Sequence, residues 1–153
     1  VLRTALPWQE TRPSLAGNHE TFYNFAAYRY RFQMPVDNLE PDVNRFNLDL
    51  YYSFNYGNVH VVAISMEELF GVAMDLHPGG AQYEWLQADL EQASANRDQQ
   101  PWIIVYAHRP LYCSCDDTKR CVDQAAYYRS LIEDLLYQYD VDIFVGAHIH
   151  NYE

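Results

Sequence analysis

Trp102-Ile103-Ile104-Val105-Tyr106-Ala107-His108-Arg109-Pro110 is the stretch that decides the fold class of this chain. It opens with a continuous apolar run over residues 102–106, which is typical of a strand buried on both faces of a sheet. His108 follows closely, and Pro110 restricts Arg109 away from helical backbone angles, so the chain turns or stays extended there. A lone histidine at such a place more often caps a turn, but several together can form a binding site at strand ends.

Two helices and a second buried strand flank this segment along the chain. Residues 81–95 carry apolar side chains on one helical face and acidic ones elsewhere, which predicts an amphipathic helix. Residues 124–139 show a similar pattern, and residues 142–146 form another short apolar run. Each predicted helix is thus followed by a buried strand. Two such units indicate an α/β fold with helices layered on a sheet.

The N-terminal half predicts a hairpin before the first of these helices. Residues 48–54 are rich in Tyr, residues 59–64 are apolar, and the turn signal Tyr56-Gly57-Asn58 lies between them. Residues 21–33 are rich in aromatic side chains and predict a short helix. Prolines punctuate the remaining segments, so we expect irregular structure over residues 1–16 and 35–41.

The composition is that of one folded, acidic domain. Apolar residues make up 49% of the 153 residues and aromatic ones 16%, which argues against disorder and allows a sizeable core. The chain has 10 Lys and Arg residues and 21 Asp and Glu residues, so its formal net charge is −11. Because no basic run or long apolar run is present, we expect neither a nucleic-acid nor a membrane partner. A phosphorylated substrate remains compatible with this charge, because metal ions reverse the local field in a cleft.

Two further segments carry the same kind of chemistry as the end of the central strand. They are Gly17-Asn18-His19-Glu20 and Gly146-Ala147-His148-Ile149-His150, and with His108 they hold four of the six histidines. Imidazole nitrogens and amide oxygens on turns are ligands for zinc, iron and manganese. His148 and His150 would point to opposite faces of an extended segment, but in a turn both can reach a paired metal site. The three segments together therefore predict a hydrolytic metal centre.

The individual residues allow more than one interpretation. Asn18 offers a neutral amide oxygen as a metal ligand, whereas the adjacent His19 projects differently and either reaches substrate or is an ordinary solvated histidine. Glu20 is either an acceptor that orients a ligand or an acid at the start of a helix. His60 lies within a predicted strand and His77 precedes a Pro-Gly-Gly turn, so we expect both to be structural or loop residues.

The cysteines lie close together in one predicted loop. Cys113, Cys115 and Cys121 have a Cys-x-Cys-x5-Cys spacing, which is unusual for zinc and leaves a fourth ligand to be found. A local disulfide plus one spare thiol is the favoured interpretation, and it indicates an oxidising compartment.

The three segments together resemble ordered motifs of the purple acid phosphatases, within the calcineurin-like metallophosphoesterases. Residues 17–20 match Gly-Asn-His-Asp/Glu, residues 105–108 match Val-x-x-His, and residues 147–150 match Gly-His-x-His with Ala147 in the place of glycine. Further stretches extend the resemblance over nearly the whole chain, namely residues 23–25, 31–35, 52–60, 82–90 and 109–114.

The resemblance implies a dinuclear centre of Fe(III) and a divalent Zn, Fe or Mn ion. Asn18, His108 and His148 resemble ligands of the divalent M2 ion, and His150 resembles a ligand of Fe(III) at M1. His19 resembles the histidine that contacts phosphate and helps to protonate the leaving group. The metals would bind phosphate and lower the pKa of a bound water, which then attacks phosphorus.

The resemblance also implies the fold and the extent of the domain. The family fold has two mixed β-sheets packed face to face with flanking helices, and residues 1–153 would be the C-terminal majority of the catalytic domain. Two earlier motifs, Asp-x-Gly and Gly-Asp-x-x-Tyr, have no match in this chain, so we expect the isolated chain to be inactive. Cys113 and Cys121 resemble a family disulfide pair, whereas loop residues 114–118 lack the two histidines of plant members.

The sequence thus predicts an acid phosphatase that hydrolyses small phosphate monoesters in a secreted or lysosomal setting. A phosphodiesterase or pyrophosphatase of the same superfamily is an alternative. A non-catalytic truncated fragment that acts as a structural or binding module is another. No particular oligomeric state is predicted.

Overall fold

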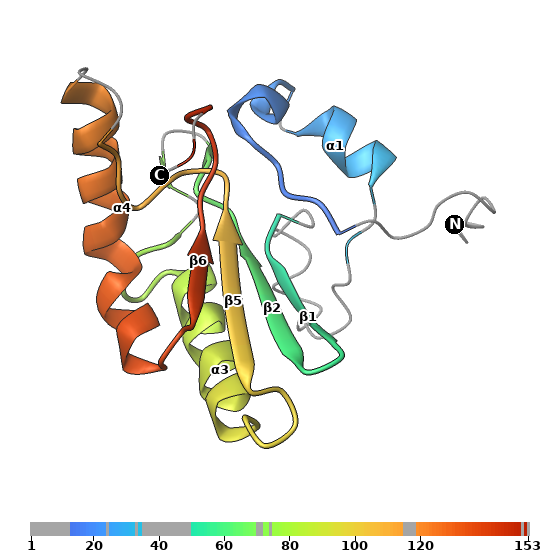
Figure 1. Ribbon diagram of the computed structural model, residues 1–153. Coiled ribbons are helices and arrows are strands. Elements are labelled where there is room, and N and C mark those ends of the chain that lie inside the picture. The colour runs from blue at the N-terminus through green and yellow to red at the C-terminus, as the bar shows by residue number, and fades with distance from the viewer. Residues whose placement is uncertain are drawn as a thin grey trace.

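A mixed β-sheet with two long helices on one face forms the centre of this protein (Figure 1). The computed structural model describes residues 13–23, 25–32, 34, 50–69, 72–73, 75–114, 119–150 and 152. Predictions for residues 1–12 and 35–41, and for Cys115, lie outside the described residues. No helix within the described ranges is long and apolar enough to cross a membrane.

The main sheet has the strand order β1-β2-β5-β6. Its strands are β1 (Tyr52–Tyr56), β2 (Val59–Ile64), β5 (Trp102–Ala107) and β6 (Ile143–Val145). β1 and β2 form an antiparallel hairpin, whereas β2, β5 and β6 run parallel. The parallel strands bring their carboxyl ends to one edge of the sheet, which is where the motif histidines begin.

The hairpin is confirmed, with a shifted first strand. β1 runs on to Tyr56, which pairs with Val59, so the turn itself is only Gly57-Asn58. Gly57 has a φ of +59°, a left-handed conformation that suits a tight hairpin turn and that glycine adopts at little cost. The prediction of strand structure from residue 48 was therefore wrong over residues 50–51, while residues 48–49 are not described.

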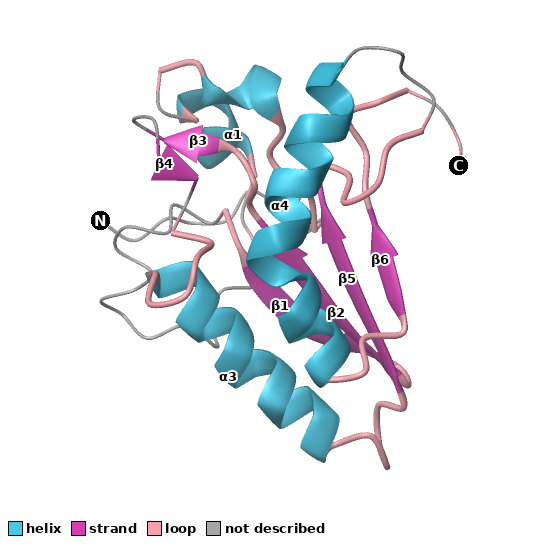
Figure 2. Ribbon diagram, turned by 90° about the vertical axis from the view of Figure 1, so that its left-hand side faces the viewer, coloured by secondary structure: helices cyan, strands magenta, loops and turns pink. Residues whose placement is uncertain are grey.

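Both long helices lie on the same face of the sheet, as Figure 2 shows. α3 (Ala81–Ala95) has the predicted bounds. α4 (Lys119–Gln138) begins five residues before the predicted start at residue 124. The sequence did not predict this early start, because Lys119 and Arg120 are polar and the segment shows no apolar periodicity. The α/β class with helices layered on a sheet is confirmed.

The aromatic segment after the first motif is less helical than predicted. It holds a 3-10 turn, η1 (Asn18–Thr21), and a short α1 (Ala26–Arg31) rather than one helix over residues 21–33. Tyr23 and Phe25 have φ values of 50° and 58°, and such left-handed residues interrupt a right-handed helix. A small two-stranded ribbon that the sequence did not predict joins β3 (Glu68–Leu69) and β4 (Val72–Ala73).

The alternation of side chains along the strands divides the core between the two faces of the sheet. One cluster fills the space between the sheet and helices α3 and α4, and α1 lies on the opposite side (Figures 1 and 2). Val62, Ile64, Ile103 and Val105 belong to that first cluster. The second cluster includes Ala16, Phe25, Tyr28, Met34, Leu50, Tyr52 and Ala63.

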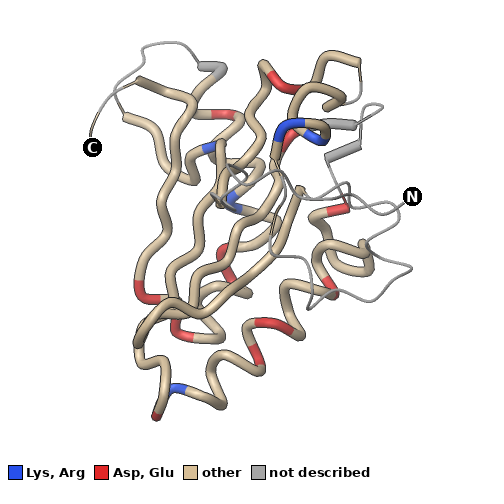
Figure 3. Tube along the Cα trace, turned by 90° about the vertical axis from the view of Figure 1, so that its right-hand side faces the viewer, with Lys and Arg blue, Asp and Glu red and all other residues tan. Residues whose placement is uncertain are grey.

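Charged residues along the described trace are mostly acidic. Figure 3 shows Asp and Glu spread over several helices and loops, with only a few separate Lys and Arg positions. The formal net charge of −11 agrees with this picture.

Candidate metal centre

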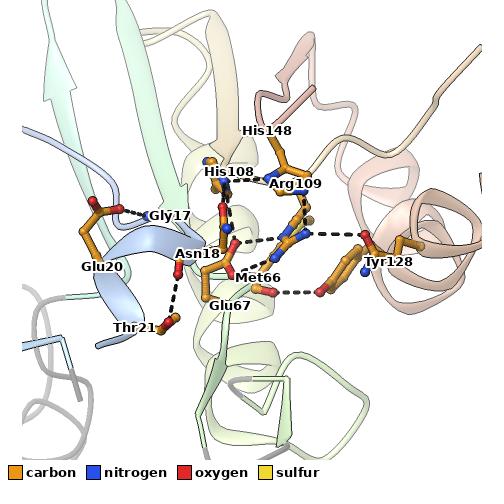
Figure 4. Close-up of polar contacts among 11 residues, drawn as sticks. Gly17, Asn18, Glu20, Thr21, Met66, Glu67, His108, Arg109, Tyr128 and His148 are labelled. Carbon is orange, nitrogen blue, oxygen red and sulfur yellow. Dashed lines mark hydrogen bonds and ion pairs between the residues drawn. The ribbon is translucent and has the colours of Figure 1, made fainter. Parts of the chain in front are cut away.

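The three motif segments meet at the carboxyl ends of β5 and β6 (Figure 4). His108 follows β5 directly, and His148 lies in the bend just beyond β6. The amide of Ala147 donates a hydrogen bond to the carbonyl of His108 (3.1 Å), which ties the two strand ends together. Asn18, the first residue of η1, reaches the same place from the N-terminal segment. The parallel pairing thus brings together residues that are distant in sequence.

One imidazole nitrogen of His108 lies close to two other possible metal-ligand atoms there, and the three atoms are called the donor triangle below. Nε2 of His108 lies 2.9 Å from Oδ1 of Asn18 and 3.0 Å from Nδ1 of His148. The two imidazole rings meet edge to face, with centroids 4.9 Å apart. Ligand atoms about 2.0–2.2 Å from a tetrahedral ion lie roughly 3.3–3.6 Å from one another. The two distances from Nε2 of His108 are therefore slightly shorter than those between two ligands of one such ion.

The chemistry of the donor triangle fits a divalent transition metal. It offers two imidazole nitrogens and one amide oxygen, all neutral, and catalytic zinc sites use three protein ligands with one position left open. Over the described ranges, no group of three or more His, Cys, Asp or Glu side chains is arranged to hold a metal. The donor triangle is not such a group, because it contains two histidines and an asparagine.

A buried ion pair lies directly behind the donor triangle. Oε1 and Oε2 of Glu67, which is 2% exposed, accept hydrogen bonds from Nε and Nη2 of Arg109, both at 2.9 Å. Nη1 of Arg109 lies 2.8 Å from Nε2 of His148 and 3.4 Å from Oε1 of Gln124. Glu67 itself is 4.0 Å from Nε2 of His108. The sequence reasoning missed Glu67 and Gln124, although an acid just after a buried strand was a usable signal.

The surroundings of His108 favour its neutral form. Burial lowers the pKa of His108, the Glu67 carboxylate opposes that change, and the Arg109 guanidinium adds to it. Farther off, Glu20 raises this pKa and His19 lowers it. A neutral imidazole has a lone pair available for a metal ion, so the environment suits a ligand.

Close packing fixes the ring of His108 against the N-terminal segment. A Cβ atom added to Gly17 would lie 2.8 Å from Cε1 and 2.9 Å from Nδ1 of His108, so any other residue there would require the ring or the segment to shift. The amide of Gly17 donates to Oε2 of Glu20 (2.7 Å), and the hydroxyl of Thr21 donates to the carbonyl of Asn18 (2.8 Å). The contact of Glu20 is that of an acid at a helix start, and its predicted role as an acceptor that orients a ligand stays a prediction.

Tyrosine hydroxyls hold the segment that leads to Asn18. Tyr28 and Tyr52 both donate to the carbonyl of Ser14, at 2.6 and 2.8 Å, and the hydroxyls of Tyr52 and Tyr106 are bonded to each other. Burial is the main cause that raises the pKa values of Tyr52 and Tyr106. These neutral phenols therefore act as hydrogen-bonding anchors from β1, β5 and α1.

Comparison with known proteins identifies the family of this chain. The profile of the calcineurin-like phosphoesterases matches residues 7–152. The chain belongs to the calcineurin-like phosphoesterase family. It is 39% identical to human acid phosphatase type 7 over 144 residues, which cover 90% of this chain and 31% of that protein. It is 31% identical to the probable purple acid phosphatase 20 of Arabidopsis thaliana, over 99% of this chain and 33% of that protein. The phosphoesterase chain thus spans about a third of the length of these relatives.

A solved structure supports the fold of this calcineurin-like phosphoesterase. The purple acid phosphatase PPD1 from yellow lupin seeds superposes with a TM-score of 0.70 at 27% identity, over 91% of this chain and 24% of that one. The metallophosphoesterase-type α/β fold expected from the sequence is therefore confirmed.

Two other predicted site residues of this phosphoesterase are not part of the donor triangle. His19 and His150 are exposed, and no hydrogen bond or ion pair of the described residues links either one to the triangle. His148 has a φ of 67°, a strained backbone conformation that is often found at functional sites. The roles assigned to His19 and His150 stay predictions.

The remaining histidines and the disulfide match the sequence predictions. Nδ1 of His60 is 2.7 Å from Oδ1 of Asn55, and its Nε2 is 2.9 Å from Oδ2 of Asp89. Both ring nitrogens thus have hydrogen-bond partners, as expected of a structural residue. His77 lies exposed in a loop. The predicted disulfide is present between Cys113 and Cys121, and it ties the loop after β5 to the first turn of α4.

Proposed function

We propose that this calcineurin-like phosphoesterase chain is part of an acid phosphatase that hydrolyses phosphate monoesters at a dinuclear metal centre. The observation that carries the proposal is the donor triangle, in which Nε2 of His108 lies within 3.0 Å of both other donor atoms. The similarity to acid phosphatase type 7 and to plant purple acid phosphatases supports the substrate class. Residues 1–153 would then be part of the catalytic domain.

The residues of this chain would hold the metals as follows. Asn18, His108 and His148 would bind a divalent Zn, Fe or Mn ion, and His150 would contribute to an Fe(III) site. The bound metals supply charge that binds phosphate and a water of lowered pKa. Burial keeps His108 neutral and ready to bind, since its pKa is lowered by the loss of solvent. The amide of Asn18 adds an oxygen donor without adding charge.

His19 is suited to work on the substrate rather than on a metal. It follows Asn18 directly on η1, its side chain is exposed, and it lowers the pKa of His108. There it would contact a phosphate oxygen and donate a proton to the leaving alkoxide, which general acid catalysis requires.

The disulfide between Cys113 and Cys121 supports an oxidising location, since such bonds persist in extracytoplasmic compartments. We therefore propose secretion or lysosomal residence, with a small phosphorylated molecule as the substrate.

Two alanine variants test the proposal in the protein that contains this chain. His108→Ala should remove one divalent ion per protein, whereas His19→Ala should keep the metal content and lower turnover of a phosphate monoester. Metal content is measured by elemental analysis and turnover with a panel of mono- and diesters. Unchanged metal content in His108→Ala would contradict the proposed site, and preferential diester cleavage would contradict the substrate class.

A further inference from the structure

Asn18 and His108 reach the donor triangle from two different kinds of backbone. His108 directly follows β5, whereas Asn18 follows residues 13–17, which belong to no helix or strand as the structure describes them. Oδ1 of Asn18 and Nε2 of His108 nevertheless lie 2.9 Å apart (Figure 4). The spacing of the two residues therefore depends on contacts other than a shared sheet ladder.

The carbonyl of Ser14, four residues before Asn18, is one such contact point. It accepts hydrogen bonds from the hydroxyls of Tyr28 (2.6 Å) and Tyr52 (2.8 Å). The amide of Ser14 donates to Sδ of Met34 (3.4 Å). Tyr28, Tyr52 and Met34 are at most 3% exposed, so water competes little for these bonds. The segment that leads to Asn18 is thus held from β1 and α1.

Tyr52 also bonds to the strand that ends just before His108. Its hydroxyl is bonded to that of Tyr106, which lies in β5 two residues before His108. Because β2 separates β1 from β5, the backbones of the two tyrosines are two strand spacings apart, about 9–10 Å. Both tyrosines pair in register with Ala63 of β2, so all three side chains leave the same face of the sheet. The small side chain of Ala63 lets the two phenols meet above it.

The hydroxyl protons of this cluster allow all three bonds at once. A carbonyl oxygen can only accept, and its two lone pairs suffice for Tyr28 and Tyr52. Tyr52 therefore gives its one hydroxyl proton to Ser14, and its own oxygen accepts from Tyr106. Burial raises the pKa of both Tyr52 and Tyr106, so both hydroxyls keep their protons.

We propose that Tyr52 is a positioning residue whose hydroxyl sets the spacing between Asn18 and His108 for metal binding. The hydroxyl bridges a carbonyl four residues before Asn18 and a phenol two residues before His108. This inference rests on the proposed metal centre and adds to it a residue outside the donor triangle. When the bridge is lost, fewer molecules hold the two donor atoms together, and the apparent affinity for an ion falls with that fraction.

The test compares three variants of the protein that contains this chain. Tyr52→Phe keeps the buried ring and removes both hydrogen bonds of the bridge, whereas Tyr106→Phe removes only the bond to β5. Ser53→Ala is the matched control, because it removes a buried hydroxyl from the next residue of β1, where it donates to Oδ1 of Asp89 (2.6 Å). Equilibrium unfolding establishes that each variant is folded.

Two measurements report on the spacing. In the metal-free protein, the nuclear Overhauser effect between the side-chain amide protons of Asn18 and the ring protons of His108 should be weaker in both tyrosine variants and unchanged in Ser53→Ala. Calorimetry with Zn²⁺ should give a Kd about 5-fold higher or more in Tyr52→Phe, the effect expected when one hydrogen bond no longer holds the competent arrangement. Ser53→Ala should keep the wild-type Kd.

The outcomes separate this inference from the proposed metal centre. A folded Tyr52→Phe with the wild-type Overhauser effect and Kd would overturn the inference, and so would equal changes in Ser53→Ala. A weaker Overhauser effect with a wild-type Kd would overturn it as well, because the spacing would then have no effect on metal binding. If the wild-type protein binds no Zn²⁺, the proposed metal centre fails, and the Overhauser effect alone decides whether Tyr52 sets the spacing.

Discussion

Arginine–carboxylate pairs lie at both ends of β5, and they have similar distances but different surroundings. At the carboxyl end, Nε of Arg109 is 2.9 Å from Glu67, whose side chain is 2% exposed. At the amino end, Nη1 of Arg97 is 3.0 Å from Asp142, and these side chains are 27% and 25% exposed. The first pair faces His148, whereas Arg97 also donates to the carbonyl oxygens of Pro101 and Tyr139.

The difference shows that the contribution of an ion pair to stability depends on how far it is buried. A partly exposed ion pair contributes little to stability, because water and salt screen it. Here Arg97 also connects loops by donating to backbone carbonyl oxygens. A buried pair costs desolvation, so its net value for stability is small, although removing one partner is severe. The buried Glu67–Arg109 pair should therefore affect stability most when only one of its partners is removed.

The largest expected effect is on folding stability when one buried partner is removed. Arg109→Met leaves the Glu67 carboxylate buried without a counter-charge, and we expect a loss of about 3–5 kcal/mol of unfolding free energy. Urea denaturation followed by circular dichroism measures it. Glu67→Gln/Arg109→Met should recover much of that loss, and a double variant as unstable as the single one would show that burial of charge is not the cause.

A substitution at Gly17 tests the packing that holds the other histidine. The new Cβ of Gly17→Ala would meet the His108 ring at 2.8 Å, so we expect a loss of about 1–3 kcal/mol from overpacking. Gly57→Asn is the matched control, because that site has open space, and Asn tolerates its φ of +59°. Equal stability of Gly17→Ala and wild type in urea titrations would mean that the segment moves freely away from His108.

The exposed pair should be far less sensitive. Arg97→Met removes one screened ion pair and its hydrogen bonds to carbonyls that water can reach, so we expect a loss of about 0.2–1 kcal/mol. The same urea titration measures it, with half the effect or less expected at high salt. A loss as large as that of Arg109→Met would erase the contrast between the two ends of β5.

The smallest effect is a pH dependence at the amino end. The amide of Ile103 donates to Asp142 (2.8 Å) and, with Arg97, lowers the pKa of that carboxyl below its ordinary value of 3.8. The unfolded chain then binds more protons near that pH, so stability falls as pH drops below about 4–5. Asp142→Asn should flatten this part of the unfolding free energy curve between pH 3 and 6, and an unchanged slope would assign it to other carboxyls.

The fold was predictable where local pattern and packing agree. The helix at 81–95 and the strand at 59–64 have the expected bounds, because periodic apolar residues there face the core. The early start of α4 was not predicted, because no periodic apolar pattern marks its first turn. A disulfide bond at Cys121 connects that turn to the loop after β5. The helix at 21–33 was overestimated, because a left-handed residue such as Phe25 leaves no mark on apolar spacing.

The site was predictable only in part, for a related reason. Asn18, His108 and His148 lie in recognisable segments, so their convergence follows from the motifs and from parallel strands. The pairing of Glu67 with Arg109 joins residues that are 42 positions apart, and no periodicity encodes it. Exposed residues such as His19 and His150 are recognisable by motif, but the packing that determines their neighbours is not local.

The long sequence separations in the donor triangle have a consequence for the order in which the molecule folds. The β1–β2 hairpin can close within microseconds, whereas His108 must meet Asn18 across 90 residues and His148 across 40. Contacts between such distant residues form late, because closing a long loop costs conformational entropy, so the geometry of the donor triangle should be among the last features acquired. An ion that binds only the folded state would stabilise it, adding about 2.7 kcal/mol to the free energy of unfolding when the ion concentration is 100 times its Kd.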